Sequence, residues 1–551
     1  MQKPISVWLI RPHDSTKQID RSALEWECDK DQNTGKYLMK RRHFLKTAAS
    51  AACAAALPNL NCSPSYKRPN ILLIMGDDIG FSDLGCYGSE IETPNLDALA
   101  RSGQRYTQFY NMAKCNPTRS SLFTGLYLPR AHADNAQSLP QMLRNAGYYT
   151  AMSGKEHFDD WVPHHCYAPS CFDRSFSYWA INPYFVPPDR PFPNPFKLDG
   201  ENVNVQDMPV KQQPFYKTDV VTNYALQFLD EREPDQPFFL YLPYHSAHYP
   251  LQARQEDIDK YRGTYQKGWD LIRKERFERQ KELGVIAHDC ELSPPEDNIN
   301  KFRGPYRRQI YKYRPWNSLS EQEQDELDLE MAVFAAMVDR MDQNIGRILA
   351  KLDEMGEREN TLILFFSDNG SCPYDSNQDF NVPPGGPASY RTLCAAWANV
   401  GDTPFRFYKQ YGHEGGCRTH MIANWPRVIK AGLVQNPAHV VDFYPTFLEL
   451  ARTNYPDQAA AKPTPKLDGK SLVSLFQGGT RENPDIIISG FTDRFRMVRI
   501  GDWKIVKVNA GPWQLYNVAK DPTELLDLAK NKPKVKELEN CYKDWLKSEN
   551  I

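Results

Sequence analysis

The sequence predicts an α/β protein whose central mixed, largely parallel sheet is sandwiched by helices, with a smaller C-terminal subdomain of antiparallel sheet plus helix. Two apolar runs, residues 71–75 and 362–366, are typical of strands buried on both faces. Residues 327–355 carry apolar side chains at steps of four and three, which indicates a long amphipathic helix. Strands that alternate with helices along a chain are typical of a mainly parallel sheet covered on both sides.

Start and stop signals predict the other elements of the large domain. Pro94 opens a helix that stops at Gly103. Ser138 stands at the cap of a second helix, which ends at Gly147. Three further segments continue the alternation, and they are a strand at 149–152, a helix at about 218–231 and a strand at 238–242.

The pattern changes toward the C-terminus, where short strands follow one another at close spacing. We expect strands at 486–489, 495–500, 503–506 and 513–516, covered by a final helix rich in Lys and Glu. The chain is therefore divided into a large α/β domain, residues 67–455, and a C-terminal subdomain, residues 456–551.

The N-terminus is interpreted separately from the fold. Residues 1–38 are polar and patternless, and we interpret them as over-annotated sequence before a true start at Met39. Residues 39–62 contain Arg41-Arg42 and then a short alanine-rich apolar stretch, which resembles a twin-arginine export signal. The stretch is too short for an ordinary membrane-spanning helix. We expect an exported protein, periplasmic or extracellular, with no stable membrane span when mature. The alternative is a cytosolic protein with a basic N-terminus.

Composition excludes some partners. The chain has 67 Lys and Arg against 69 Asp and Glu, so it lacks the basic surplus that nucleic-acid binding requires. Its 12 cysteines are spread over 551 residues and form neither a disulfide framework nor a zinc-ribbon pattern. Cys166 could pair with Cys171, and Cys372 with Cys394, but spacing leaves both pairings open.

Polar residues follow both fully apolar strands. Asp77 and Asp78 come after the first strand, and Asp368 and Asn369 come after the second. Ligands of open α/β sheets bind at the carboxyl ends of the strands. Three carboxylates and an amide oxygen are a ligand set for a hard divalent cation. An isolated Asp-Asp pair is more often a solvated turn, but two acidic strand ends on one sheet favour a metal site.

Cys115 stands just before a predicted helix start, in the run Lys114-Cys115-Asn116-Pro117-Thr118-Arg119. Pro117 suits the first helical turn, because its missing N–H has no partner to lose there. Arg119 follows Cys115 by four residues and so shares its helix face. The thiol, the helix N–H groups and the guanidinium would form an anion site that contains a reactive group. An ordinary cysteine at a helix cap is the alternative.

Four more basic residues lie in short motifs. Lys155 and His157 are two residues apart and share a face of an extended segment. His248 lies just past the strand at 238–242, and His245 before it is expected at most beside the substrate or behind the site. Lys409 precedes the run His413-Glu414-Gly415-Gly416. Each of these residues by itself could equally be a surface lysine or a structural histidine.

Taken together and in this order, the motifs resemble those of the type I sulfatases of the alkaline phosphatase superfamily. The resemblance covers roughly residues 68 to 530 and rests on Cys-x-Pro-x-Arg, on Gly-Lys-Glu-His, on a histidine before an aromatic residue and proline, and on a lysine five residues before the Glu of Glu-Gly-Gly. Glu156 stands where the family has an aromatic residue, Gly-Lys-Trp-His.

The resemblance implies an enzyme that hydrolyses sulfate esters. A maturation enzyme would oxidise Cys115 to formylglycine (3-oxoalanine), whose hydrate attacks the sulfate group. The implied ion is Ca²⁺, with Mg²⁺ as the alternative, and its ligands would be Asp77, Asp78, the side chain at Cys115, Asp368 and Asn369.

The resemblance also implies roles for the remaining residues. Arg119, Lys155 and Lys409 would neutralise the sulfate charge, and Asp368 would be the base on the attacking hydroxyl. His248, with Lys409, would protonate the departing alcohol, so Lys155, His248 and Lys409 would also bind substrate. His157 would take the proton from the second hydroxyl of the hydrate.

Two other functions stay open at this point. Phosphonate monoester or phosphodiester hydrolases share the implied fold, and an exported binding protein with an inactive site would keep only part of the chemistry. The substrate is expected to be an aryl or carbohydrate sulfate. Trp179, Tyr184 and Phe185 could stack on a sugar or aryl ring, but buried loop anchors are the favoured interpretation.

Overall fold

The computed structural model describes residues 67–131, 135–158, 162–163, 167–179, 181–189, 191–208, 214–295, 313–459, 462–492, 495–509 and 511–548. The predicted extension (1–38), the predicted export signal (39–62) and Cys166 lie outside these residues. Residues 67–551 form one compact unit of the chain.

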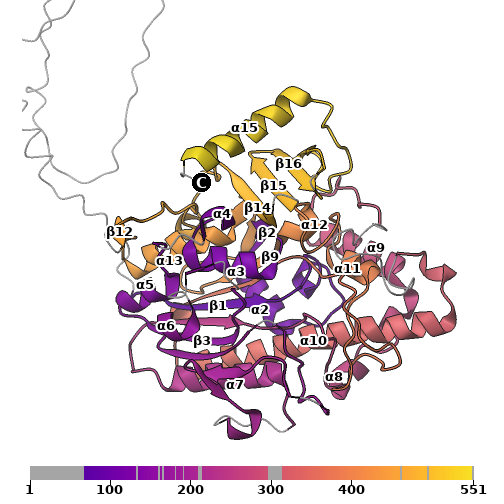
Figure 1. Cartoon of the computed structure of the whole chain (residues 1–551), viewed down its shortest axis with the longest axis horizontal. Coiled ribbons are helices and arrows are strands. Elements are labelled where there is room, and N and C mark those ends of the chain that lie inside the picture. Colours follow the sequence, from indigo (N-terminus) through magenta and orange to yellow (C-terminus); the bar gives the residue numbers. More distant parts are fainter. Residues whose placement is uncertain are drawn as a thin grey trace, which may run out of the picture. The chain divides into compact units, whose positions relative to one another are not determined.

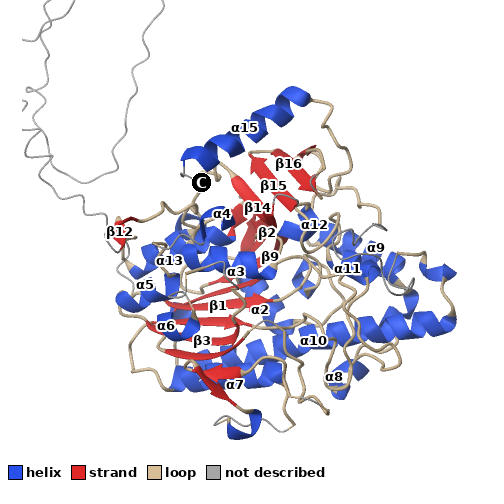
Figure 2. Cartoon of the chain, viewed as in Figure 1, coloured by secondary structure: helices blue, strands red, loops and turns tan. Residues whose placement is uncertain are grey.

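The described residues of the large domain form a sheet of 11 strands. Figures 1 and 2 show this sheet in the middle of the large domain. Its order is β10-β2-β9-β8-β1-β7-β3-β4-β5-β6, and β11 also pairs with β2. The strands are β1 (Asn70–Gly76), β2 (Gln104–Tyr110), β3 (Tyr149–Lys155), β4 (Arg174–Tyr178), β5 (Phe196–Leu198), β6 (Glu201–Val203), β7 (Phe238–Pro243), β8 (Thr361–Ser367), β9 (Arg418–Asn424), β10 (Gly432–Val434) and β11 (Ala438–His439).

The sheet is mixed and largely parallel. Strands β8, β1, β7, β3 and β4 pair in parallel, whereas β9 and β5 run antiparallel to both of their neighbours. Every residue of β1, β7 and β8 is buried. Strands buried on both faces need apolar side chains at every position, which is why their sequences are continuous apolar runs. The predicted fold class is confirmed.

Helices cover both faces of this sheet (Figure 2). Leu240 of β7 belongs to the core that the sheet shares with helices α7 (Lys217–Asp230) and α10 (Glu321–Glu354). Its neighbours point the other way, because side chains alternate along a strand. Phe239 meets Phe447 of helix α13 (Phe443–Ala451) with ring centroids 5.8 Å apart, and Tyr241 meets Phe123 of helix α3 (Cys115–Thr124) at 5.4 Å. The sheet is therefore sandwiched between two helical layers.

The helices have the following bounds: α2 (Pro94–Ser102), α3 (Cys115–Thr124), α4 (Leu128–Ala131), α5 (Leu139–Asn145), α6 (Ala168–Cys171), α7 (Lys217–Asp230), α8 (Gln255–Asp259), α9 (Trp269–Glu282), α10 (Glu321–Glu354), α11 (Ala395–Gly401), α12 (Glu414–Cys417), α13 (Phe443–Ala451), α14 (Val473–Phe476) and α15 (Lys532–Ser548). Of these helices of the described chain, none has both the length and the apolar character to cross a membrane.

The starts of helices α10 and α5 can be compared with the start signals in the sequence. Helix α10 begins earlier than predicted, because Ser320 and Glu323 form a capping box in which each side chain bonds the other residue's backbone N–H. Ser138 does occupy the cap position of α5, yet its side chain makes no capping hydrogen bond. Pro140 in the first turn of α5 has no backbone N–H, so this turn has one donor fewer for a side-chain cap to bind.

The C-terminal subdomain is a separate four-stranded antiparallel sheet under a helix (Figure 1). Its strands follow the chain, in the order β14 (Ile487–Thr492), β15 (Phe495–Ile500), β16 (Trp503–Val508) and β17 (Gln514–Asn517). Met497 packs toward the large domain in a cluster with Tyr110, while Val498 packs toward Leu538 of α15. The predicted antiparallel sheet plus helix is confirmed.

A buried ion network joins this small sheet to the large domain. Lys504 of β16 places its Nζ 2.6 Å from Glu414 Oε1 and 2.9 Å from Glu524 Oε1. Burial and the charge of Glu414 raise the pKa of Glu524 to about 7, although Lys504 opposes the shift. Burial would raise the pKa of Glu414, but the charge of Lys504 lowers it to about 2. One ammonium group therefore neutralises Glu414, and Glu524 keeps its proton in mildly acidic solution.

Replacement of Glu524 by glutamine should flatten the pH dependence of stability. The folded state binds this proton more tightly than the unfolded chain, so the free energy of unfolding falls as pH rises between about 4.5 and 7. The full change is about 3 kcal/mol for a shift of this size. Urea unfolding of wild type and Glu524→Gln at pH 5 and pH 8 measures it. Asp342, whose pKa burial raises to about 6, contributes equally to both proteins. If the free energy of unfolding changes equally with pH in wild type and Glu524→Gln, the prediction is wrong.

Candidate active site and metal centre

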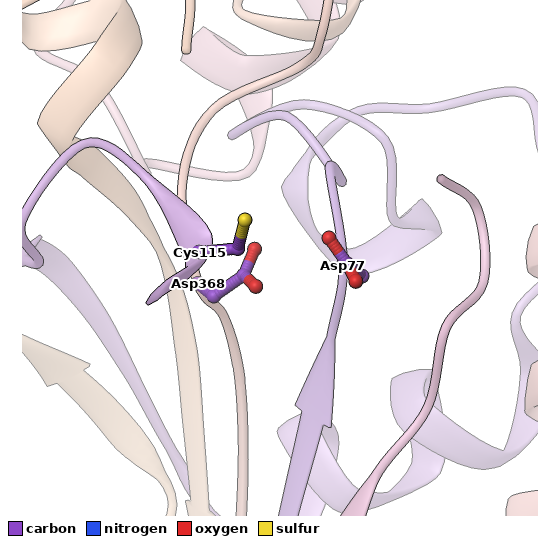
Figure 3. A group of neighbouring side chains, drawn as sticks. All are labelled: Asp77, Cys115 and Asp368. Atoms are coloured by element: carbon purple, nitrogen blue, oxygen red, sulfur yellow. The ribbon is translucent and has the colours of Figure 1, made fainter. Parts of the chain in front are cut away.

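The carboxyl ends of β1 and β8 meet at one edge of the sheet. These strands pair in parallel with Gly76 opposite Ser367, so the residues that follow them leave the sheet side by side. Helix α3 begins at the same place, and Cys115 is its first residue. Ligand atoms of Asp77, Cys115 and Asp368 all lie within 4.8 Å of one another, and Figure 3 shows these side chains grouped together. The structure thus brings the predicted acidic and thiol groups into one site.

Three buried oxygen atoms in this site accept no hydrogen bond. They are Asp77 Oδ1, Asp78 Oδ2 and Asn369 Oδ1. The amide nitrogen of Asn369 donates to Asp78 Oδ1 at 2.8 Å and to Gly370 O at 2.8 Å, which turns its oxygen away from both. Buried polar atoms are nearly always paired, so three unpaired acceptors together indicate a cation site.

Three buried cationic side chains bind one oxygen each of Asp77, Asp78 and Asp368. Arg119 Nη2 lies 2.7 Å from Asp368 Oδ2 and 3.3 Å from Asp77 Oδ2, so one guanidinium bridges two strand ends. Lys155, at the end of β3, forms an ion pair with Asp77, and Lys409 forms one with Asp78. All three cations come from elements distant in sequence, and each pairs with a residue predicted as a metal ligand.

The ionisation of the three carboxylates is uneven. Burial would raise the pKa of Asp77, but Lys155, His248 and Arg119 together hold it below its usual value. Burial and the charge of Asp77 raise the pKa of Asp368 well above its usual value in spite of Arg119. The ionised form of Asp368 is therefore disfavoured, chiefly by burial. A divalent cation on the unpaired oxygens would add positive charge and favour the ionised form of Asp368.

The first turn of helix α3 is hydrogen-bonded to the backbone that follows β8. Thr118 Oγ1 donates to Asp368 O at 2.7 Å, and Met112 N donates to Thr118 Oγ1 at 3.1 Å. Cys115 is only 2% exposed, and its Sγ lies 3.3 Å from His157 Nδ1. The thiol, the helix start and His157 are therefore held together, as the motifs predicted.

Non-glycine residues in the left-handed backbone region gather around the site. They are Asp78 at φ 63°, Ala113 at φ 58°, His157 at φ 52° and Gln410 at φ 81°. Such conformations cost about 1–3 kcal/mol each and cluster at active sites and ligand sites. The surrounding packing holds these residues in place, which indicates a preorganised site.

His248 approaches the same carboxylate as Lys409. Its Nε2 lies 3.5 Å from Asp78 Oδ2, and its Nδ1 lies 2.8 Å from Tyr249 O. A carbonyl oxygen only accepts, so Nδ1 carries a proton and Nε2 is the nitrogen that faces the site. Burial lowers the pKa of His248 to about 3 although Asp78 opposes the shift. The imidazole is therefore neutral while no substrate anion lies beside it.

Comparison with known families decides what kind of site this is. The family model for sulfatases matches residues 69–453 of the chain. The chain belongs to the sulfatase family. It is accordingly an enzyme of the sulfuric ester hydrolase class. A second model, for the C-terminal part of N-sulphoglucosamine sulphohydrolase, matches residues 404–550.

Two curated relatives show the extent of the similarity. An uncharacterised sulfatase of Schizosaccharomyces pombe is 32% identical over 507 residues, which is 81% of this chain and 87% of the relative. An arylsulfatase of Klebsiella aerogenes is 28% identical over 472 residues, which is 78% of this chain and 97% of the relative. The similarity thus spans most of the length of both relatives.

Solved structures share the fold. A protein solved in complex with k-i-k-neocarrahexaose superposes with a TM-score of 0.61 and 24% identity over 87% of this chain and 92% of that protein. A second, solved with its substrate D-glucosamine-2-N,6-O-disulfate, has a TM-score of 0.59 and 22% identity over 88% and 98%. The phosphonate monoester hydrolase of Agrobacterium radiobacter has a TM-score of 0.53 and 17% identity over 87% and 95%.

The sulfatase site contains two basic residues beyond the predicted catalytic and metal-binding set. Lys217 is the first residue of α7 and is buried, with its Nζ 2.6 Å from His245 Nδ1. The sequence placed His245 at most beside the substrate and gave no sign of Lys217. A lysine in the first turn of a helix is usually a solvated surface residue, so only its burial reveals it.

Other sequence expectations are settled in the described residues. Cys372 and Cys394 form no disulfide with each other, so this pairing is wrong, and the Cys166–Cys171 pairing ends on a residue outside the description. Tyr184 is fully buried against His245, and Phe185 packs against the core, as the anchor interpretation predicted. Trp179 is half-buried and contacts Tyr167 edge to face.

Proposed function

We propose that this sulfatase hydrolyses a carbohydrate or aryl sulfate with an oxidised Cys115 as nucleophile and a bound divalent cation. The observation that carries the proposal is the convergence at one sheet edge of a thiol at a helix start, three unpaired buried oxygens and three buried cations. A protein that only bound an anion would not need the thiol and the acidic cluster together.

The nucleophile would be made from Cys115 by a formylglycine-generating maturation enzyme. Oxidation converts the –CH₂–SH side chain to an aldehyde, and the hydrate of that aldehyde supplies one hydroxyl for attack and a second for release. His157 lies 3.3 Å from the sulfur atom, so it is placed to accept the proton of the second hydroxyl. Asp368, which a bound cation would keep ionised, would accept the proton of the attacking hydroxyl.

Asp77, Asp78, Asp368, Asn369 and position 115 would hold the cation. Their donor atoms are carboxylate and amide oxygens, and several flexible oxygen ligands favour Ca²⁺ over Mg²⁺. The ion would supply Lewis acidity to a sulfate oxygen. Three carboxylates balance Arg119, Lys155 and Lys409, so a divalent ion would leave the site with a net positive charge for a sulfate anion.

Lys409 and His248 would serve the departing alcohol. Burial would lower the pKa of Lys409, but the negative charge of Asp78 raises it well above its usual value. This ammonium group therefore keeps its proton. His248 is neutral in the free site. The negative charge of a bound sulfate ester would raise its pKa, so His248 would take up a proton as the substrate binds. Both groups contact the carboxylate of Asp78, His248 at Oδ2 and Lys409 at Oδ1.

A sulfated sugar is the substrate class that we favour. A structural neighbour was solved with its substrate D-glucosamine-2-N,6-O-disulfate, and an N-acetylglucosamine-6-O-sulfatase of Bacteroides thetaiotaomicron is 26% identical over 479 residues. We also propose that the protein is exported by its twin-arginine signal and meets such a sugar outside the cytoplasm. Detection of the mature protein in a periplasmic or secreted fraction supports this location.

Released sulfate and the mass of one peptide test the function. Purified protein is incubated with sulfated amino sugars, aryl sulfates, phosphodiesters and phosphonate monoesters, and the released anion is measured by ion chromatography. We expect sulfate release to exceed the other activities by at least about 10²-fold in kcat/KM. Mass spectrometry of the tryptic peptide that starts at Cys115 should show sulfur replaced by oxygen. Faster phosphonate or phosphodiester hydrolysis would assign the alternative enzyme class, and unmodified Cys115 without activity would indicate a binding protein.

A further inference from the structure

Lys217 is buried beside the site without a carboxylate partner in the described part of the chain. Its side chain donates to Asn182 O, contacts His245 Nδ1 at 2.6 Å and lies 4.1 Å above the ring centre of Tyr184. Burial and the nearby charge of Lys155 lower its pKa well below the usual value. A buried lysine with no counter-charge destabilises a fold and is typical of functional sites.

The ring of His245 stacks on two other rings. Its centre lies 5.3 Å from that of Tyr184, at an interplanar angle of 16°, and 4.9 Å from that of His248, at 24°. Tyr249 also contacts His248, with the two ring centres 4.2 Å apart and the planes at 32°. The plane of the His248 ring is therefore restricted by its contacts with His245 and Tyr249.

The backbone around both histidines is held by the same tyrosine. The Tyr184 hydroxyl lies 2.6 Å from His245 O and 2.9 Å from His248 O, so its proton is shared between two carbonyl groups. The hydrogen bond of His248 Nδ1 with Tyr249 O and the stacked His245 ring both restrict rotation of the His248 ring. The His245 ring is itself bound by Lys217 at Nδ1.

We propose that Lys217 and His245 are positioning residues that hold the imidazole of His248 with Nε2 turned toward the departing alcohol. The inference rests on the role of His248 in the proposed function. Lys217 fixes the His245 ring through Nδ1, His245 stacks on His248, and Tyr184 clamps the turn that carries both. Neither Lys217 nor His245 touches the reacting atoms in this scheme.

The dependence of rate on the leaving group distinguishes positioning from a merely structural role. An aryl sulfate with a strongly acidic phenol departs without a proton, whereas a sugar sulfate releases a basic alkoxide that must be protonated. Lys217→Met keeps the length of the side chain and removes its donor. We expect kcat to fall about 100-fold on a sugar 6-sulfate and less than about 3-fold on 4-nitrophenyl sulfate, with KM changed less than about 2-fold.

A matched control is Lys504→Met, which removes another fully buried lysine far from these rings, in the small C-terminal sheet. It should lower the melting temperature and leave the ratio of the two kcat values at the wild-type level. If Lys217→Met lowers both rates equally, or lowers neither, the inference is wrong while the proposed function stands. If Lys217→Met does not fold, Tyr184→Phe removes a single oxygen and must shift the same ratio in the same direction.

Crystal structures make the inference testable independently of turnover. The Lys217→Met protein should show the His245 ring rotated and the Nε2 atom of His248 displaced from Asp78, relative to the wild type. If wild-type protein releases sulfate from neither ester, the proposed function fails, and the ring positions alone then decide the inference. Unchanged His245 and His248 rings in the variant would overturn it.

Discussion

Replacement of Cys115 by alanine is expected to abolish sulfate ester hydrolysis while the protein stays folded. Cys115 is the first residue of α3 and its Sγ lies close to carboxylate oxygens of Asp77 and Asp368, so in the proposed mechanism its side chain would attack a sulfate group held by a cation on these carboxylates. Removal of a nucleophile from a site whose other parts remain lowers kcat by at least about 10⁴-fold. The rate of sulfate release measures the loss.

Two controls separate loss of chemistry from loss of structure. Cys115→Ser keeps a hydroxyl at the position but cannot form the aldehyde by the same oxidation, so it should be nearly as inactive as the alanine variant. Cys394→Ala removes another fully buried thiol, at the cap of α11, and should retain activity within about 2-fold. Near-wild-type turnover in Cys115→Ala would show that the proposed nucleophile is wrong.

Replacement of Asp78 by asparagine is expected to remove the metal and most of the activity. Asp78 has a φ of 63°, and asparagine adopts this left-handed conformation more readily than other non-glycine residues, so the backbone should be preserved. The change removes one negative charge from the ligand set and the ion-pair partner of Lys409. We expect the bound metal to fall from about one ion per chain to below about a tenth.

Elemental analysis of dialysed protein measures the bound metal, and the rate should fall by about 10²–10³-fold. Asp83→Asn is the matched control, because Asp83 is also a buried carboxylate close after β1 but is bound by Arg276 at 2.6 Å. It should keep its metal. Chelation of the wild-type protein should remove activity, and added Ca²⁺ should restore it. An unchanged metal content in Asp78→Asn would remove Asp78 from the ligands.

The elements that are encoded locally could be predicted from the sequence. Continuous apolar runs found β1 and β8 within one residue at each end, because a strand buried on both faces needs apolar side chains at every position. The apolar period found α10, although the capping box at Ser320 was overlooked and its start was placed too late. The four C-terminal strands were likewise predicted from short runs between turns.

The members of the candidate site could be predicted because strand ends and a helix start carried unusual residue types. Asp77, Asp78, Asp368 and Asn369 follow buried strands, and Cys115 precedes Pro117 at the start of α3. Motif order then linked these residues to Lys155, His157, His248 and Lys409. Their contacts, however, join residues up to several hundred positions apart, which no local pattern determines.

The remaining features depend on burial and on long-range charge. Lys217 has no motif, and it becomes informative only when α7 buries it beside His245 and Tyr184. Spacing could not decide whether Cys372 pairs with Cys394, and in the fold the two form no disulfide with each other. The opposite pKa shifts of Asp77 and Asp368 depend on which carboxylate Lys155 reaches.

From its sequence alone this protein could be assigned its α/β architecture, its sulfatase motifs and the candidate residues of its site, because periodicity and short motifs act over a few neighbouring positions. Tertiary structure decided which oxygens remain unpaired, which cation binds which carboxylate, and that His248 lies in a stack anchored by a buried lysine. Those properties follow from the dielectric environment and the distances between charges, and both exist only after distant segments have packed together.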